Sequence, residues 1–159
     1  MKGISLLSIL TNTFIGILII AVLAFLSANL NKDQYELKEA EKLIRELTDL
    51  RIAIDKYYNL TGSLPNLTLE SASSDLGIIR DKDETGRIVS FYDIYGKNEI
   101  PSTPEISGIK KSNKVIDSNN FSEADKNGGW YYDYSGGTGE LHVNLPDNVF
   151  DQGVDWINY

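Results

Sequence analysis

Residues 3–31 read GISLLSILTNTFIGILIIAVLAFLSANLN and contain no charged side chain. The centre of this stretch, residues 14–26, is apolar on every side, and only Gly16 interrupts the run of side chains. As an α-helix, the uncharged stretch would be about 43 Å long at roughly 1.5 Å per residue. The hydrocarbon core of a bilayer is about 30 Å thick. Residues 4–31 are therefore predicted to form a transmembrane helix.

The charge that precedes this stretch predicts its orientation. Lys2 and the amino terminus lie before the apolar run, which favours an N-terminus inside and a C-terminus outside. A cleavable secretory signal is one alternative, with Val22-Leu23-Ala24 as its only tolerable cleavage site, but its apolar region would be only about 7–15 residues long. A buried helix of a soluble protein is the other alternative. A single-pass membrane anchor is expected.

The pattern becomes amphipathic after Lys32 without a helix breaker. Apolar side chains then recur at steps of three and four, the spacing of one face of an α-helix: Ala40, Leu43, Ile44, Leu47, Leu50, Ile54, Tyr57 and Tyr58. Gly62-Ser63-Leu64-Pro65 predicts the end of the helix. Residues 32–62 are expected to continue the same helix, whose packing against a head domain involves Leu43, Leu47, Ile54 and Tyr57. Two helices joined by a bend near residues 29–31 are the alternative.

Residues 63–159 predict a small globular head that contains β-strands. Residues 87–95 are β-branched and aromatic, as expected of a strand, and a second short strand is expected around Val115-Ile116. The clearest pattern is a hairpin closed by residues 135–139, an allowed loop length. Its alternating apolar residues are Trp130, Tyr132 and Tyr134, then Leu141, Val143 and Leu145. The expected fold class is α+β, with a long N-terminal helical spine packed under a small antiparallel β-sheet.

These features together resemble those of the type IV pilins and the pseudopilins of type II secretion. The resemblance is carried by Gly3 before the apolar run, by Ile15-Gly16-Ile17-Leu18 within it, and by the amphipathic continuation over residues 47–58. The turn over residues 61–65 is similar to this family's exit from the long helix, and residues 128–146 are similar to the terminal hairpin of many small pilin-like proteins. Residues 66–128 have no counterpart in the resemblance.

The resemblance implies processing and assembly. In this family a short basic leader ends in glycine and is removed by a prepilin peptidase, so residues 1–3 correspond to the leader and Ile4 to the new, methylated N-terminus. The subunit then waits in the inner membrane with its N-terminus inside and its head outside. An inner-membrane assembly platform lifts it into a helical filament, where its helix exchanges lipid for other pilin-like subunits.

The chain departs from the family at one assembly position. The fifth mature residue is usually a glutamate that neutralises the free N-terminal amine of a neighbouring subunit. Here that position is Ser8, or Leu7 if the chain is aligned on Gly16, and neither is acidic. A buried charge without a partner is strongly unfavourable. The resemblance therefore implies a subunit placed where no partner amine needs neutralising, such as a filament tip, or one that seldom enters the filament.

Oxygen-bearing side chains crowd the end of the chain: Asp147, Asn148, Asp151 and Asp155. Calcium prefers hard oxygen ligands of this kind. The major pseudopilins that this chain resembles hold a calcium ion in their C-terminal loop. These four residues are therefore candidate calcium ligands. A solvated acidic tail held down by Phe150 and Trp156 is the alternative.

Composition argues against several function classes. The formal net charge of −8 makes nucleic acid a poor direct partner, and the absence of cysteine excludes disulfides and thiolate metal sites. The only histidine, His142, is expected to face solvent because it alternates with apolar neighbours. No serine lies in a Gly-x-Ser-x-Gly elbow, and no enzymatic activity is expected. The leading interpretation is a filament subunit; the alternative is a permanently anchored extracytoplasmic domain whose aromatic side chains bind a peptide or a sugar.

Overall fold

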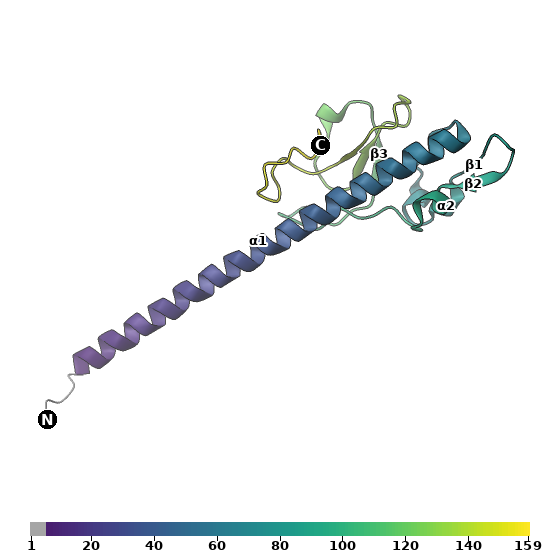
Figure 1. The fold of residues 1–159 in the computed structure, drawn as a ribbon. Helices are drawn as coiled ribbons and strands as arrows, with labels where there is room; N and C mark the ends of the chain where they lie inside the picture. Colours follow the sequence, from purple (N-terminus) through teal and green to yellow (C-terminus); the bar gives the residue numbers. More distant parts are fainter. Residues whose placement is uncertain (1–5) are drawn as a thin grey trace. The chain divides into compact units, whose positions relative to one another are not determined.

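The computed structural model describes the backbone of residues 6–159 and the side chains from Ile17 onward. The chain divides into two compact units, one that ends at Lys38 and one that comprises Glu39–Tyr159, which we call the folded unit. The first helix, α1 (Leu6–Thr61), contributes to both units (Figure 1).

Helix α1 runs without interruption through residues 29–31, where a bend was the alternative. Leucine and isoleucine are its commonest residues, and no proline occurs before Pro65, so no backbone hydrogen bond is removed by sequence. The helix ends where predicted. Gly62 adopts a φ of 73°, and its N–H donates to the Tyr58 carbonyl at 2.7 Å. Glycine adopts this left-handed cap without a steric penalty.

The amphipathic part of α1 supplies one side of the core of the folded unit. Its buried apolar side chains recur at helical spacing: Ala40, Leu43, Leu47, Leu50, Ala53, Ile54 and Tyr57. They belong to the same cluster as Trp130, Tyr132, Leu141, Val143 and Leu145. The four residues predicted for spine packing, Leu43, Leu47, Ile54 and Tyr57, are at most 2% exposed. Fully burying one such side chain stabilises the fold by roughly 1.5–3 kcal/mol, so this stripe contributes substantially to holding the helix against the sheets.

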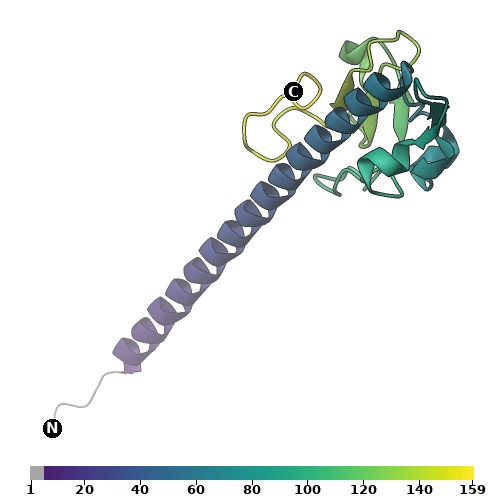
Figure 2. The ribbon, with the colours of Figure 1, turned by 45° about the vertical axis from the view of Figure 1, so that its right-hand side comes forward.

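Five short strands follow α1 in the described chain and form two sheets (Figures 1 and 2). Strands β1 (Arg80–Lys82) and β2 (Ile88–Ser90) form an antiparallel pair with Asp81 opposite Val89. Strands β3 (Val115–Asp117), β4 (Trp130–Tyr132) and β5 (Leu141–Val143) form the second sheet in that order. The hairpin β4–β5 is antiparallel, as predicted, with Tyr131 opposite His142. The α+β class and the short strand at Val115 are confirmed.

Strand β3 runs parallel to β4, which makes the second sheet mixed. A parallel neighbour requires a crossover rather than a tight turn, and residues 118–129, which include the 3-10 helix η3 (Phe121–Glu123), provide it. The crossover ends at Gly128 and Gly129, whose φ values are 91° and 84°. The Trp130 N–H then donates to the Lys114 carbonyl at 2.8 Å. This close approach fixes β3 beside β4.

The predicted strand over residues 87–95 is wrong beyond Ser90, because the chain turns into helix α2 (Phe91–Tyr95). Ser90 and Asp93 form a capping box: the Asp93 N–H donates to Ser90 Oγ, and the Ser90 N–H donates to Asp93 Oδ2, both at 3.2 Å. Gly96, with a φ of 75°, ends the helix. The capping box satisfies backbone groups locally and overrides the β propensity of the aromatic residues. Two 3-10 helices, η1 (Glu70–Ser73) and η2 (Leu76–Ile78), precede the strands.

The hairpin loop covers residues 133–140, longer than predicted. Asp133, which is 2% exposed, accepts hydrogen bonds from the Gly136 N–H at 2.8 Å and from Thr138 Oγ1 at 2.7 Å. Strand β4 ends at Tyr132, so Tyr134 lies in the loop and not in the strand.

Candidate functional site

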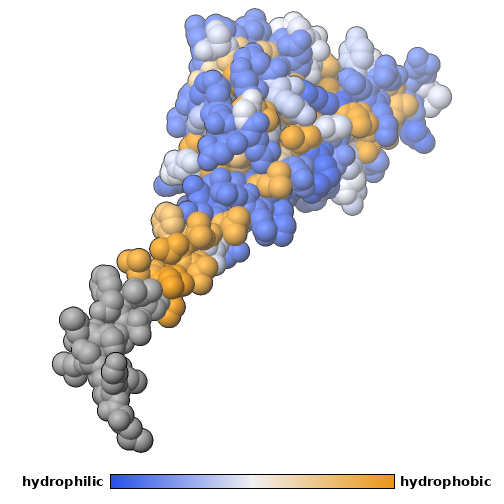
Figure 3. Space-filling view, turned by 60° about the vertical axis from the view of Figure 1, so that its left-hand side comes forward, coloured by the Kyte–Doolittle hydropathy of each residue, from blue (hydrophilic) through white to orange (hydrophobic). Residues whose placement is uncertain are grey.

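The part of α1 between residues 17 and 30 exposes its apolar side chains, which form a band of orange surface in Figure 3. Nine large ones are between 51% and 68% exposed: Ile17, Leu18, Ile19, Ile20, Val22, Leu23, Phe25, Leu26 and Leu30. Monomeric soluble proteins rarely expose a large contiguous patch of this kind. By length and composition, α1 is able to cross a membrane.

The predicted processing residues, Gly3 and Ile4, lie outside the described residues. Ser8, and Leu7 of the alternative alignment, lie within α1, but their side chains are outside the described part of the chain. No acidic residue occurs between Gly3 and Asn31 in the sequence. The roles assigned to these residues therefore stay predictions.

Two of the candidate calcium ligands are engaged with other side chains. Asp147 Oδ1 lies 2.9 Å from Lys126 Nζ and forms a salt bridge. Asp155 Oδ2 accepts a hydrogen bond from Asn158 Nδ2 at 2.7 Å. That hydrogen bond is the main cause of a lowered pKa at Asp155. Both carboxylates thus have partners within the described chain.

The other two candidates shape the backbone of the terminal loop. The side-chain carbonyl of Asn148 accepts a hydrogen bond from the Gly153 N–H, and the Asn148 N–H donates to the Val154 carbonyl at 2.8 Å. Asp151 is exposed and has a φ of 54°. In the described chain, no three histidine, aspartate or glutamate side chains are placed to hold one metal ion. The assignment of calcium to these four residues stays a prediction.

An open cavity of about 380 Å³ lies between α1 and the β4–β5 hairpin, lined by Arg51, Asp55 and residues 138–142. Arg51 Nε and Nη2 donate to the Leu141 carbonyl at 3.0 and 2.7 Å, and Nη1 donates to the Tyr159 carbonyl at 3.1 Å. The guanidinium therefore binds main-chain oxygens and holds α1 against β5. A charged donor of this kind makes a stronger hydrogen bond than a neutral one.

His142, which lines this cavity, does not face solvent as predicted, since its side chain is only 15% exposed. Its ring centroid lies 4.2 Å from that of Phe121 in η3. Its Nδ1 atom is buried and forms no hydrogen bond of ordinary geometry. The nearby main chain of Ile157 nevertheless acts to raise the pKa of the ring. Burial, and then the positive charge of Arg51, lower the pKa of His142 below its ordinary value of 6.5, and Glu140 opposes this shift.

Acidification is expected to destabilise the folded unit through His142. The pKa of His142 is lower in the folded chain than in the unfolded chain. The folded unit therefore keeps its full stability while the pH lies above the pKa of the unfolded state, and it loses stability as the pH falls through and below that pKa. Melting temperatures of the full chain in detergent micelles, measured between about pH 7.5 and 5, should fall toward the acid end. The variant His142→Gln should flatten this decline. The lowered carboxyl pKa values, such as that of Asp155, act only at lower pH. An equal decline in both proteins would contradict the assignment to His142.

A further charged cluster, which the sequence analysis missed, joins α1 to the segment after α2. Lys97 Nζ lies 3.9 Å from both Glu46 Oε1 and Asp49 Oδ2, and 5.1 Å from the centre of the Tyr95 ring. Burial, then the charges of Glu46 and Asp49, raise the pKa of Tyr95, so its hydroxyl keeps its proton. The only local signal was an acidic pair three residues apart on α1. Its partner lies far along the chain.

Comparisons with known protein families, with curated proteins and with solved structures found no match to this chain. Its function is therefore inferred from its own residues and from the resemblance described above.

Proposed function

We propose that this chain is a structural subunit of a filament of the type IV pilus or type II secretion pseudopilus kind, anchored in the membrane by α1 before assembly. One observation carries the proposal: the single helix α1 exposes apolar side chains over residues 17–30 and supplies the core of the folded unit over residues 40–57. In lipid, helices associate by packing rather than by a hydrophobic driving force. The apolar half can therefore exchange lipid for neighbouring helices while the folded unit keeps its core.

The proposal gives roles to the residues at the amino terminus. Gly3 ends a leader that a prepilin peptidase removes, and Ile4 becomes a methylated N-terminus. The N-terminus faces the inside of the inner membrane and the folded unit lies outside, where the assembly platform collects it. Ser8 stands in place of the usual acid. The chain has no catalytic role and no direct nucleic-acid partner in this proposal.

Mass spectrometry of the native amino terminus tests the proposal. We expect the mature chain to begin at Ile4 and to carry one N-methyl group. The variant Gly3→Val should retain residues 1–3, whereas Ser27→Ala, which changes a helix position far from the leader, should be processed normally. An unaltered chain that keeps Met1-Lys2-Gly3 would contradict the proposal.

A permanently anchored binding domain is the second candidate. The observation that favours it is the open cavity of about 380 Å³, whose lining includes the charged side chains of Arg51, Asp55 and Glu140. An anchored domain of this kind would keep its first three residues, so the same mass measurement separates the two candidates.

A further inference from the structure

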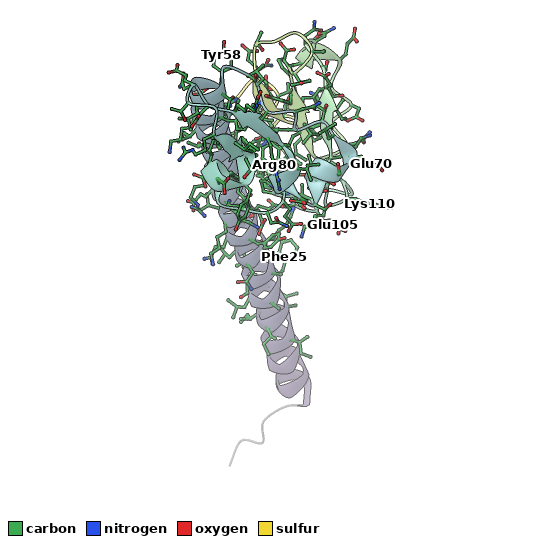
Figure 4. The ribbon with its side chains drawn as sticks, turned by 90° about the vertical axis from the view of Figure 1, so that its right-hand side faces the viewer. Phe25, Tyr58, Glu70, Arg80, Glu105 and Lys110 are labelled. Carbon is green, nitrogen blue, oxygen red and sulfur yellow. The ribbon has the colours of Figure 1, made fainter. Side chains whose placement is uncertain are left out.

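Residues 106–114, which we call the lysine ridge, carry three exposed lysines and no acidic residue. Lys110 and Lys111 form no salt bridge with the described chain. The pKa of Asp125 is lowered chiefly by its hydrogen bond from Asn144 and to a lesser degree by the charge of Lys114. The positive charge of Lys114 is therefore partly balanced by Asp125. Figure 4 labels Lys110 and Glu105, which lie at one margin of the folded unit. The two uncompensated lysines are therefore available to a partner.

The ridge is held on a fixed backbone. Ile106 and Ile109 exchange two main-chain hydrogen bonds of 3.1 and 2.8 Å, and the Thr103 N–H donates to the Ser112 carbonyl at 2.8 Å. Thr103 is fully buried, and its Oγ1 accepts a hydrogen bond from the Gly129 N–H at 2.8 Å. A partner that binds a preorganised segment loses less conformational entropy on docking.

The opposite charge gathers at the other end of the folded unit's sequence. Residues 133–159 contain no lysine or arginine and five acids: Asp133, Glu140, Asp147, Asp151 and Asp155. Asp133 is buried and Asp147 pairs with Lys126, whereas Asp151 and Asp155 are exposed and form no salt bridge with the described chain. Residues 147–155, which we call the acidic loop, are closed by the hydrogen bond between the Asn148 N–H and the Val154 carbonyl at 2.8 Å.

We propose that the lysine ridge of one copy docks on the acidic loop of a second copy of this chain. Each copy carries a net charge of −8, so two copies repel one another in most orientations. The approach that places the ridge on the loop brings opposite charges together, and like-charge contact disfavours the others.

Ridge and loop are different surfaces, so this contact is heterologous, and heterologous contacts that do not close build open filaments. The docking is thus a lateral contact between neighbouring subunits of the proposed filament. It rests on that function in one respect, because both folded units must lie on the same side of the membrane.

Disulfide cross-linking between full-length chains tests the docking, because the natural sequence contains no cysteine. Ser107 in the ridge and Gln152 in the loop are both exposed. Chains that carry Ser107→Cys and chains that carry Gln152→Cys, distinguished by tags and produced together in one membrane, should form a mixed disulfide on oxidation. The matched control pairs Gln152→Cys with Glu84→Cys, an exposed position outside the ridge, and should give at least about tenfold less product.

Charge reversal identifies the occupant. Lys110→Glu with Lys111→Glu on the ridge chain, or Asp151→Lys with Asp155→Lys on the loop chain, should lower the yield about tenfold, a difference of about 1.4 kcal/mol. The two reversed chains together should restore it. An anionic lipid or a foreign acidic protein on the ridge would show no such restoration, which would overturn the proposal.

Two further measurements keep the outcomes distinct. With the original charges, the yield should fall as salt rises from about 0.1 to 1 M, because the Debye length shrinks from about 10 to 3 Å; a constant yield would contradict docking even if a reversed variant misfolds. Protease accessibility of the folded unit at the outer face of the inner membrane, in cells whose outer layers have been removed, is read separately. An accessible unit without cross-links overturns the docking alone, whereas an inaccessible unit overturns the proposed function.

Discussion

Replacing Gly129 with alanine is expected to destabilise the folded unit by at least about 3 kcal/mol. A Cβ at this position would lie 2.4 Å from the Lys114 carbonyl oxygen and 3.1 Å from Ser112 Oγ, and the φ of Gly129 is +84°. The left-handed backbone costs a non-glycine residue about 1–3 kcal/mol. The clash adds to this cost, because the Lys114 oxygen accepts the Trp130 N–H at 2.8 Å and cannot move without breaking that hydrogen bond.

Gly137→Ala is the matched control for this substitution. Its φ is almost the same, +82°, but nothing lies within 4 Å of the position that a Cβ would take. Only the backbone cost should remain, about 1 kcal/mol. Urea unfolding of the full chain in detergent micelles, followed by tryptophan fluorescence, measures both losses because Trp130 and Trp156 are fully buried in the folded unit. Equal losses in the two variants would contradict the close approach of β3 to residue 129.

The features that the sequence predicted well depend on local patterns. Neighbouring residues alone are enough to recognise three of these features: the uncharged stretch, the helical spacing of Leu43, Leu47 and Ile54, and the cap at Gly62. The same holds for the hairpin, since the alternation around Trp130 and Leu141 predicts two strands, although Tyr131 on the other face of β4 is buried as well. These patterns were sufficient to predict the α+β class because they show which apolar surfaces must be buried against another element.

The features that were missed are of two kinds. The capping box of Ser90 and Asp93 was visible as a Ser-x-x-Asp spacing, but the β-branched and aromatic residues around it outweighed that signal. The burial of His142 could not be predicted, because Phe121 reaches its ring only through the crossover that places β3 parallel to β4. The contact of Lys97 with α1 is likewise set by the tertiary fold.

The candidate functional residues were predicted from a different source. Gly3, Ile4 and Ser8 were assigned by resemblance, and the measurements proposed above test them directly. The calcium ligands were assigned from composition and resemblance, and in the structure one of them, Asp147, forms a salt bridge with Lys126. Composition alone does not show which acid has such a partner.

Leu47→Asp is expected to unfold the folded unit while leaving the chain in the membrane. Leu47 is 1% exposed, and truncating a buried leucine already costs about 2–5 kcal/mol. Placing an unpaired carboxylate there adds the cost of burying a charge, so the total approaches the whole stability of a typical domain, about 5–15 kcal/mol. The exposed apolar part of α1, which is able by length and composition to cross a membrane, is unaffected.

Ile52→Asp makes the same kind of change five positions further along α1, where the side chain is 47% exposed. Surface substitutions of this kind change stability by about 0.5 kcal/mol or less. Limited proteolysis of membranes that contain each variant should therefore digest the folded unit of Leu47→Asp rapidly and leave that of Ile52→Asp as resistant as the original chain. Both variants should sediment with the membranes. Equal resistance would mean that the buried stripe of α1 does not form part of the core of the folded unit. The filament proposal would then lose its basis, because it depends on one part of α1 facing lipid and the other part supplying that core.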